Sequence, residues 1–230
     1  MAASFMIAIT GGSGSGKTTL ARALHERLGA DRCVLVTEDN YYRPRAFYGQ
    51  AALSMENAEL ERTFNFDDPA GKDMEHLRRD IEALKRGESI EQPVYDFPTH
   101  DRRHGSVKHI EARPVVIIEG IHVLSDQSFL PLFDLTVFVD APADLRLIRR
   151  IRRDETERGR SAESVIRQYL SFVRDAYRRF IEPARSVCDI VVVCDAAPVQ
   201  RDVAQDKASV ALLVAPVWSR LQQLNIAPNG

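Results

Sequence analysis

Short apolar runs alternate along the chain with longer segments in which apolar residues recur every three or four positions. The runs are rich in β-branched residues and predict buried strands at residues 5–9, 33–37, 115–118, 135–140 and 190–193. Helical periodicity is present over residues 17–28, 74–84, 144–157, 163–181 and 211–224. Strands that alternate with helices indicate an α/β protein, with a mostly parallel sheet and helices on both of its faces.

Three parts of the chain depart from this alternation. Residues 41–71 are aromatic, polar and weakly periodic, which predicts a long functional loop with at most short helices. Residues 93–97 and 106–110 are expected to pair as a small β-hairpin around a polar turn. The chain becomes polar again before its last helical segment, so we expect one domain over residues 1–195 and a C-terminal helical extension over residues 196–230.

Composition and charge limit the classes of function. The chain has 230 residues, of which 44% are hydrophobic and 28% charged, as in an ordinary soluble globular protein. Its net charge of −2 indicates no general attraction to nucleic acid or membranes, and no apolar run is long enough to span a bilayer. The three cysteines, an odd number in apolar surroundings, predict reduced thiols, and the N-terminus lacks a signal-peptide pattern. We therefore expect a cytoplasmic protein without nucleic-acid or membrane partners.

A glycine-rich segment follows the first predicted strand and opens the first predicted helix. It has the pattern Gly-x-x-x-x-Gly-Lys-Thr, and its residues are Gly11, Gly12, Ser13, Gly14, Ser15, Gly16, Lys17, Thr18 and Thr19. In this context the pattern predicts a phosphate-binding P-loop. The glycines let backbone N–H groups turn toward a polyphosphate, and the helix N-terminus adds its positive dipole. Lys17 reaches the terminal phosphates and Thr18 offers a hydroxyl to Mg²⁺, so the expected cofactors are ATP or GTP, as phosphate donor, and Mg²⁺.

Two carboxylates stand at the ends of predicted strands, where open parallel sheets place their ligands. Asp39 follows the strand after the P-loop helix, where it suits accepting the proton of an alcohol or orienting it for in-line attack. Glu119 follows the run 115–118 and suits a magnesium site with Thr18. The alternatives are a turn or cap aspartate at Asp39 and a surface turn acid at Glu119. A P-loop alone does not distinguish a kinase from a GTPase switch or a motor ATPase.

Further segments, in order along the chain, resemble the uridine kinase family. They are Asn-Phe-Asp-Asp-Pro at 65–69, Pro-Val-Tyr-Asp-Phe-Pro-Thr-His at 93–100, the arginine-rich run at 149–160 and Gln168-Tyr169, and they accompany the P-loop and Glu119-Gly120. The resemblance covers roughly residues 5–194. It implies a P-loop NTPase-type fold with small hairpin and helical lid insertions, and ATP-dependent phosphorylation of the 5′-hydroxyl of uridine and cytidine. It also allows a homo-oligomer, although the sequence itself indicates no interface.

The resemblance also implies roles for individual residues. Asp39 matches the family's catalytic aspartate, and Thr18 and Glu119 match its magnesium site. The acceptor loops at 40–71 and 93–110 and the later helices supply the matches to substrate-binding positions, which are Tyr42, Phe66, Asp67, Tyr95, Phe97, His100, Arg150 and Gln168. Asp67, Arg150 and Gln168 match residues at the ribose. Tyr95 and His100 match residues at the pyrimidine.

A lid is implied at about residues 150–162, in a helical stretch that is expected to break at Gly159. The family's lid arginines, which close on the phosphates, match Arg153, Arg158 and Arg160. We expect these arginines to be unpaired and the lid to be mobile until phosphate arrives.

Other interpretations of these segments remain. Tyr95 and Phe97 alternate along a predicted strand and would also suit a core, while His100 would also suit a solvated turn. The arginines of the run would also suit an RNA-binding face, although the interleaved acids favour a solvated, salt-bridged helix. Asp68 stands where the family usually has histidine, which adds a carboxylate near His100.

Two other functions fit parts of the sequence. A phosphoribulokinase-like sugar kinase would need cationic residues for a substrate phosphate where Tyr95 and His100 stand. A nucleotide-dependent switch is suggested by Asp-Pro-Ala-Gly at 68–71, but this segment follows no hydrophobic strand and the chain has no Asn-Lys-x-Asp motif. The sequence therefore favours a pyrimidine nucleoside kinase.

Overall fold

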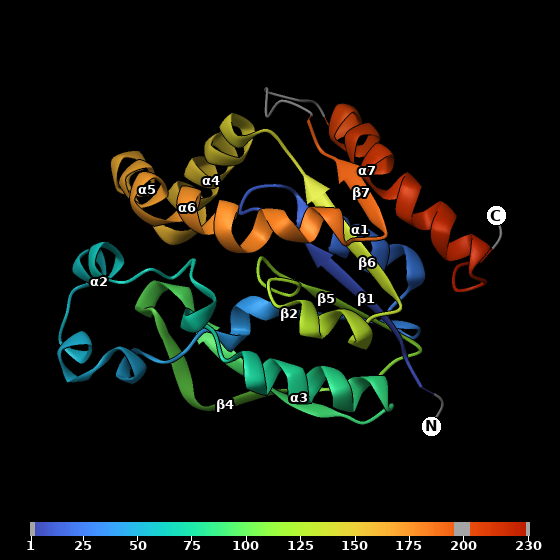
Figure 1. Cartoon of the computed structure of the whole chain (residues 1–230), viewed down its shortest axis with the longest axis horizontal. Helices are drawn as coiled ribbons and strands as arrows, with labels where there is room; N and C mark the ends of the chain where they lie inside the picture. Colours follow the sequence, from blue (N-terminus) through green and yellow to red (C-terminus); the bar gives the residue numbers. More distant parts are fainter. Residues whose placement is uncertain (1–2, 196–202, 229–230) are drawn as a thin grey trace.

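The computed structural model describes residues 3–195 and 203–228, and a five-stranded parallel sheet forms its centre (Figure 1). The strand order across the sheet is β2-β5-β1-β6-β7. The strands are β1 (Phe5–Thr10), β2 (Cys33–Thr37), β5 (Val115–Glu119), β6 (Leu135–Asp140) and β7 (Ile190–Val193). The strands predicted from the five apolar runs are thus confirmed.

Side chains of the central strand alternate between two buried clusters, one on each face of the sheet. Met6 and Ala8 of β1 belong to the cluster that α3 (Met74–Lys85) covers. Ile7 and Ile9 belong to the cluster that α1 (Lys17–Leu28) and α7 (Val203–Gln223) cover. Because successive side chains of a strand point to opposite faces, a continuous apolar run buries both of them. The predicted helical layer on each face is confirmed.

The helical region after β6 contains the predicted break. Helix α4 (Ala143–Arg158) ends at Gly159, which has a φ of 65°, a left-handed conformation that glycine adopts without a Cβ clash. The chain then enters α5 (Ala162–Gln168) and continues helically through two π-helical turns and α6 (Arg174–Ala176) to Ile181. These helices lie at one end of the sheet, above the segment that contains α2 (Figure 1).

The small hairpin is longer than the sequence indicates. Strand β3 (Ile90–Asp96) pairs antiparallel with β4 (Asp101–Ile110), and the turn between them is the short Phe97–Thr99 segment with His100. Polar residues 101–105, which the pattern predicts in the turn, belong to β4 instead. Most of β4 is exposed, so it lacks the apolar alternation that marks a half-buried strand.

Residues 41–71 form the predicted long loop, and short helices are its only regular elements among the described residues. They are α2 (Asn57–Thr63) and 3₁₀ helices that include Arg45–Tyr48, Gln50–Leu53 and Pro69–Gly71. A third apolar cluster holds this loop against the hairpin, and its buried members are Tyr42, Ala52, Leu60, Phe66 and Tyr95. The loop is therefore packed well enough to position side chains.

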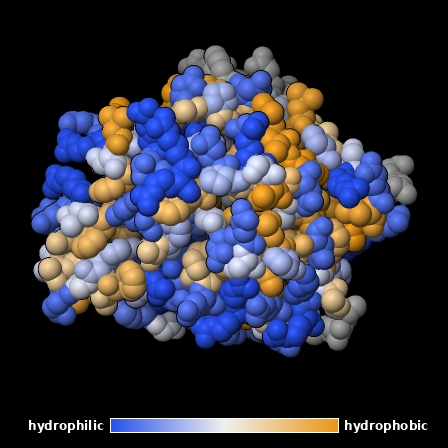
Figure 2. All heavy atoms as spheres, in the orientation of Figure 1, coloured by the Kyte–Doolittle hydropathy of each residue, from blue (hydrophilic) through white to orange (hydrophobic). Residues whose placement is uncertain are grey.

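The C-terminal helix α7 packs against the sheet layer (Figure 1). Leu213, Val217 and Leu221 share a buried cluster with the β1 residues Ile7 and Ile9. The predicted helix is confirmed, while the domain boundary expected at residue 196 lies outside the described residues. On the face shown in Figure 2, apolar side chains gather over β7 and α7 among otherwise polar surroundings.

Two further expectations concern the membrane and the cysteines. Across residues 3–195 and 203–228, no helix is both long and apolar enough to cross a membrane. The three cysteines are free thiols, and burial raises the pKa of both Cys33 and Cys188 to about 12. These two thiols are therefore protonated at neutral pH and chemically inert.

Candidate active site

The P-loop lies between β1 and α1, at the carboxyl edge of the sheet. Gly11 and Gly14 have φ angles of 146° and 79°, and a Cβ at either position would collide with a backbone oxygen of a neighbouring segment. Gly16 precedes α1 without a side-chain cap, so the first-turn N–H groups are left for a ligand. Within the described part of the chain, Ser15 Oγ is also buried without a hydrogen-bond partner. These features fit a loop that surrounds phosphate oxygens.

Lys17 and Thr18 begin α1 and face the end of β5. Thr18 Oγ1 lies 3.2 Å from both carboxylate oxygens of Glu119 and donates to them. Burial raises the pKa of Glu119, although the charge of Lys17 opposes the shift. Burial likewise lowers the pKa of Lys17, against the charges of Glu119 and Asp39. A hydroxyl and a carboxylate are oxygen ligands of the kind that Mg²⁺ takes, so this pair fits the expected metal ion.

Asp39 follows β2 and is held by a lysine that the sequence analysis does not identify. Lys72 Nζ lies 2.7 Å from Asp39 Oδ1 and 3.0 Å from Glu38 Oε1, and the Lys72 side chain is fully buried. The ammonium also lies 4.1 Å from the centre of the Tyr42 ring. Burial acts to raise the pKa of Asp39, but Lys72 and Lys17 together hold it well below its usual range. Asp39 is therefore ionised, and 34% of its side chain remains exposed.

The course of the long loop brings Lys72 to Asp39. Tyr42 and Lys72 form an isolated antiparallel β-bridge, which returns the end of the loop to its beginning. Glu38 accepts from the backbone N–H of His122 at 2.9 Å, and its carboxylate occupies the space in which a Cβ of Gly120 would lie. Lysine is usually exposed, and the sequence around Lys72 carries no sign of burial. Only the fold identifies it as part of the site.

The predicted substrate-binding residues all line one cavity beside Asp39. The cavity is lined by Ser13, Lys17, Asp39, Tyr42, Phe66, Asp67, Tyr95, Phe97, His100, Ile121, Arg150, Arg153, Arg158, Arg160 and Gln168. Its volume is about 50 Å³, whereas pockets that hold small ligands typically measure about 300–1,000 Å³. Side chains at the cavity would therefore have to move to admit a ligand of ordinary size. We refer to it as the acceptor cavity.

Asp67, Arg150 and Gln168 form a buried polar group in the acceptor cavity. Arg150 Nη1 lies 3.3 Å from Asp67 Oδ1, and Arg150 Nη2 donates to Gln168 Oε1 at 2.7 Å. A carboxylate accepts hydrogen bonds, a guanidinium donates them and an amide does both, so the group can bind a vicinal diol. Arg150 and Arg146 point into the protein from α4 and are buried. Their burial argues against an RNA-binding face on this helix.

Aromatic rings form another part of the acceptor cavity. The centre of the Tyr95 ring lies 5.0 Å from that of Tyr42 and 5.2 Å from that of Phe97. Tyr95 belongs to the third apolar cluster, which confirms the core interpretation, and it also lines the cavity, a position that is compatible with the predicted binding role. Phe97 is not in the strand as predicted, because it begins the turn after β3. Flat apolar walls of this kind suit a nucleobase.

His100 lies in the same turn, with a φ of 51° and its ring centre 5.3 Å from that of Phe66. Its side chain is only 16% exposed, so the alternative of a solvated turn histidine is wrong. Its Nε2 lies 3.0 Å from Glu61 Oε1. The carboxylate beside His100 is therefore Glu61 and not Asp68, whose side chain instead accepts from the backbone N–H of Ala70. Glu61 lies in the long loop, outside every recognised motif.

The lid arginines surround one buried carboxylate, Asp154 of α4. The closest nitrogen–oxygen distances to Asp154 are 2.8 Å from Arg153, 3.6 Å from Arg158 and 3.5 Å from Arg160. The expectation that these arginines are unpaired is therefore wrong. Asp154 lies four residues after Arg150 and four before Arg158, and this helical spacing is the signal that could have identified it.

Arg160 has further partners on the acceptor side of the cavity. Its Nη2 lies 2.8 Å from Glu61 Oε2, and its Nη1 donates to Gln168 Oε1 at 2.8 Å. Arg158, in contrast, stacks on the Phe97 ring at 4.1 Å. These contacts join Arg160 to His100 through Glu61, so in this structure Arg160 is paired on the His100 side of the cavity.

Comparisons with known proteins identify the family of the chain. Residues 6–200 match the model of the Phosphoribulokinase / Uridine kinase family. A uridine kinase from Geobacillus sp. (strain WCH70) is 46% identical over 187 residues, which are 81% of this chain and 84% of that protein. A chloroplastic uridine/cytidine kinase from Arabidopsis thaliana is 39% identical over 188 residues, 82% of this chain and 37% of that protein. The structure of phosphoribulokinase from Rhodobacter spheroides shares the fold, with a TM-score of 0.60 at 23% identity over 83% of this chain and 70% of that one. The chain therefore belongs to the phosphoribulokinase/uridine kinase family and is a kinase.

Proposed function

We propose that the protein transfers the terminal phosphoryl group of ATP to the 5′-hydroxyl of uridine or cytidine. The observation that carries the proposal is the acceptor cavity, which joins Lys17 and Asp39 to the Asp67–Arg150–Gln168 group and the aromatic rings. These residues are of the types that a phosphate, a ribose diol and a flat base require. The names of the relatives, uridine kinase and uridine/cytidine kinase, support the same acceptor.

The P-loop would bind the phosphate donor, ATP or GTP. Its N–H groups and the N-terminus of α1 present positive ends to the donor's phosphates. The Lys17 ammonium stabilises the negative charge that develops on the transferred phosphoryl group. Thr18 and Glu119 would hold Mg²⁺. When bound, the metal ion neutralises phosphate oxygens.

Asp39 would orient the acceptor hydroxyl. Its Oδ1 is bonded to Lys72 Nζ, which leaves Oδ2 to accept a hydrogen bond from the 5′-hydroxyl. A carboxylate whose pKa lies well below its usual range is a weak base, so Asp39 holds the hydroxyl in line and takes its proton late in the transfer. Asp67, Arg150 and Gln168 would hold the ribose diol and so set the position of the 5′-hydroxyl. Arg153 and Arg158 would approach the phosphates when the lid closes.

A coupled assay of nucleoside-diphosphate release tests this proposal with a panel of ribonucleosides and sugar phosphates as acceptors. Turnover is expected with uridine and cytidine, and not with adenosine or guanosine, because Tyr95 and Phe97 are expected to form walls that fit a single pyrimidine ring. Lys17→Ala serves as the control for a contaminating kinase and is expected to lose turnover while it keeps the thermal stability of the wild type. Turnover of adenosine equal to that of uridine, or turnover of sugar phosphates alone, would contradict the proposal.

The phosphoribulokinase-like alternative finds less support in the acceptor cavity. A substrate phosphate at the far end of the acceptor needs cationic partners there. Glu61 instead presents a carboxylate to His100 at this end and already pairs with Arg160. We assign the kinase domain to residues 1–195, with the lid at about residues 150–162 and α7 as an extension.

A further inference from the structure

We propose that Glu61 sets the choice between uridine and cytidine by fixing the proton on His100, at the base end of the acceptor cavity. This inference rests on the proposed function, in which His100 contacts the pyrimidine. Glu61 acts on the substrate through His100, so it is a positioning residue.

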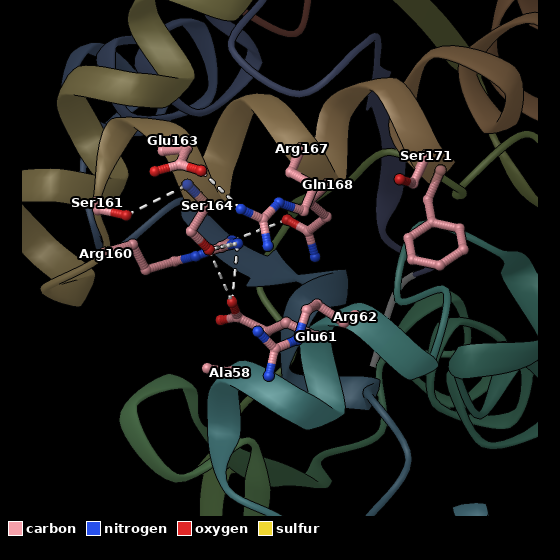
Figure 3. A pocket seen from close by; sticks show the side chains of 11 residues that line it. Ala58, Glu61, Arg62, Arg160, Ser161, Glu163, Ser164, Arg167, Gln168 and Ser171 are labelled. Atoms are coloured by element: carbon pink, nitrogen blue, oxygen red, sulfur yellow. Dashed lines mark hydrogen bonds and ion pairs between the residues drawn. The ribbon is translucent and has the colours of Figure 1, made fainter.

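Glu61 is a buried carboxylate that joins the long loop to the lid. Its side chain is 7% exposed, and its Oε1 lies 3.0 Å from His100 Nε2. Its Oε2 lies 2.8 Å from Arg160 Nη2 and accepts from Ser164 Oγ at 3.4 Å. Figure 3 shows Glu61 pointing from α2 toward Arg160 and Ser164. Both carboxylate oxygens are therefore engaged within the protein.

The ionisation of Glu61 decides where the imidazole proton lies. Burial acts to raise the pKa of Glu61, but the hydrogen bond from His100 and the charge of Arg160 outweigh it and lower the pKa. An ionised carboxylate only accepts hydrogen bonds, so Nε2 of His100 must carry the hydrogen in this contact. A neutral imidazole has a single N–H, and its other nitrogen, Nδ1, is then an acceptor. Nδ1 is thus the ring nitrogen that remains for a substrate.

An acceptor at Nδ1 distinguishes the two pyrimidines. Cytosine carries a 4-amino group, which can donate to Nδ1, whereas uracil carries a 4-oxo group, which only accepts. A 4-oxo group opposite Nδ1 leaves two acceptors without a proton between them. Such an unsatisfied contact lowers relative kcat/KM by about tenfold or more. Wild-type protein is therefore expected to prefer cytidine by about this factor.

A second cavity beside Glu61 provides space for a substitution. It has a volume of about 410 Å³, lies between α2 and α5, and is bordered by Glu61, Arg160 and Gln168 (Figure 3). Arg160 and Gln168 also line the acceptor cavity, so the two cavities share this wall. Because Glu61 borders open space, Glu61→Gln changes its charge without compressing a packed core.

The kinetic test compares kcat/KM for uridine and cytidine at about pH 8, in the wild type and in each variant. In Glu61→Gln, the side-chain amide can donate to Nε2, which moves the hydrogen to Nδ1 and lets His100 donate to the uracil 4-oxo group. The ratio of kcat/KM values is expected to shift toward uridine by about tenfold. Glu59→Gln, an exposed acid on the same helix, is the matched control and is expected to leave the ratio unchanged. An unchanged ratio in Glu61→Gln, or a wild type that prefers uridine, would overturn the inference.

A spectroscopic test separates this inference from the proposed function, because it needs no turnover. NMR spectra of the imidazole nitrogens report the tautomer of His100, with His100→Asn to identify its signals. The wild type is expected to show the hydrogen on Nε2, and Glu61→Gln is expected to lose this preference. If neither pyrimidine nucleoside is phosphorylated, the proposed function fails, but the tautomer still reports on Glu61. A tautomer that is the same in the wild type and in Glu61→Gln would contradict its role.

Discussion

Replacing Lys72 by methionine is expected to destabilise the protein and to impair catalysis. The Lys72 side chain is fully buried, with its Nζ 2.7 Å from Asp39 Oδ1 and 3.0 Å from Glu38 Oε1. Methionine has a similar length and fills the space of the aliphatic stem, so the substitution mainly removes the charge. Two neighbouring carboxylates then lose the cation between them, and the 2.7 Å bond that fixes Asp39 disappears.

The magnitude follows from the burial of the ion pairs. Removing one partner of a buried ion pair typically costs about 3–5 kcal/mol, because the remaining charge is left uncompensated. For a protein of this size, each kcal/mol lowers Tm by roughly 2–4 °C, which corresponds to a fall of about 6–20 °C. The loss of orientation at Asp39 is expected to lower kcat by about 10²-fold, as a misplacement near 1 Å does in enzymes.

The stability difference is also expected to depend on pH. In the wild type, Lys72 helps to hold the pKa of Asp39 well below its usual range, so this carboxylate contributes stability that persists until strongly acidic pH. Without Lys72 the effect of burial is opposed by fewer charges, and the pKa of Asp39 rises. The variant then takes up a proton at a higher pH than the wild type does, and protonation relieves its unpaired charge. The difference in Tm between the wild type and Lys72→Met should therefore become smaller as the pH is lowered from about 8 to about 4.5.

Thermal unfolding and steady-state kinetics of the purified variant test these expectations. Lys108→Met, an exposed lysine on β4, is the control and is expected to change stability by less than about 0.5 kcal/mol. The double variant Lys72→Met/Glu38→Gln also removes one of the two unpaired carboxylates. Compared with Lys72→Met, it is expected to regain part of the lost Tm but none of the lost kcat. A Tm and a kcat that both match the wild type would show that Lys72 neither stabilises the fold nor positions Asp39.

Three other predictions follow from the acceptor cavity and the lid. Asp39→Asn is expected to keep the fold and to lose about 10²–10⁴-fold in kcat; retention of more than about a tenth of the wild-type turnover would exclude the proposed role. The kcat/KM for uridine is expected to exceed that for 2′-deoxyuridine, because the missing hydroxyl leaves Asp67 or Arg150 without a hydrogen-bond partner, at a cost of ~1–3 kcal/mol. Equal values of kcat/KM would refute the placement of the ribose diol at these two residues. Hydrogen exchange over residues 153–160 should slow when a bisubstrate analogue binds, since a cavity of about 50 Å³ must open to admit ligand and then close over it. Unchanged protection would count against a lid.

The order of amino acids along the chain is enough to predict the central sheet and the phosphate site. A strand buried on both faces must be apolar at successive positions, so the runs at 115–118 and 135–140 identify strands without any knowledge of their neighbours. The P-loop is equally local, because its chemistry resides in consecutive residues between a strand and a helix. Family motifs in order along the chain predict the acceptor residues, and the structure brings these residues to one cavity.

The charges that surround these residues, in contrast, come from distant parts of the chain and depend on the folded arrangement. Lys72 is separated from Asp39 by 33 positions in the chain, and Glu61 from His100 by 39. A polar residue looks the same in a sequence whether it is solvated or buried, and burial is tolerated only where the fold supplies an opposite charge or a hydrogen bond. The same reason explains why residues 101–105 resemble a turn: pairing with β3, and not their own pattern, makes them a strand. Local periodicity thus determines the strands of the central sheet and the long helices, whereas contacts between distant segments determine the full length of β4, the ionisation of Asp39 and the hydrogen-bond partner of His100.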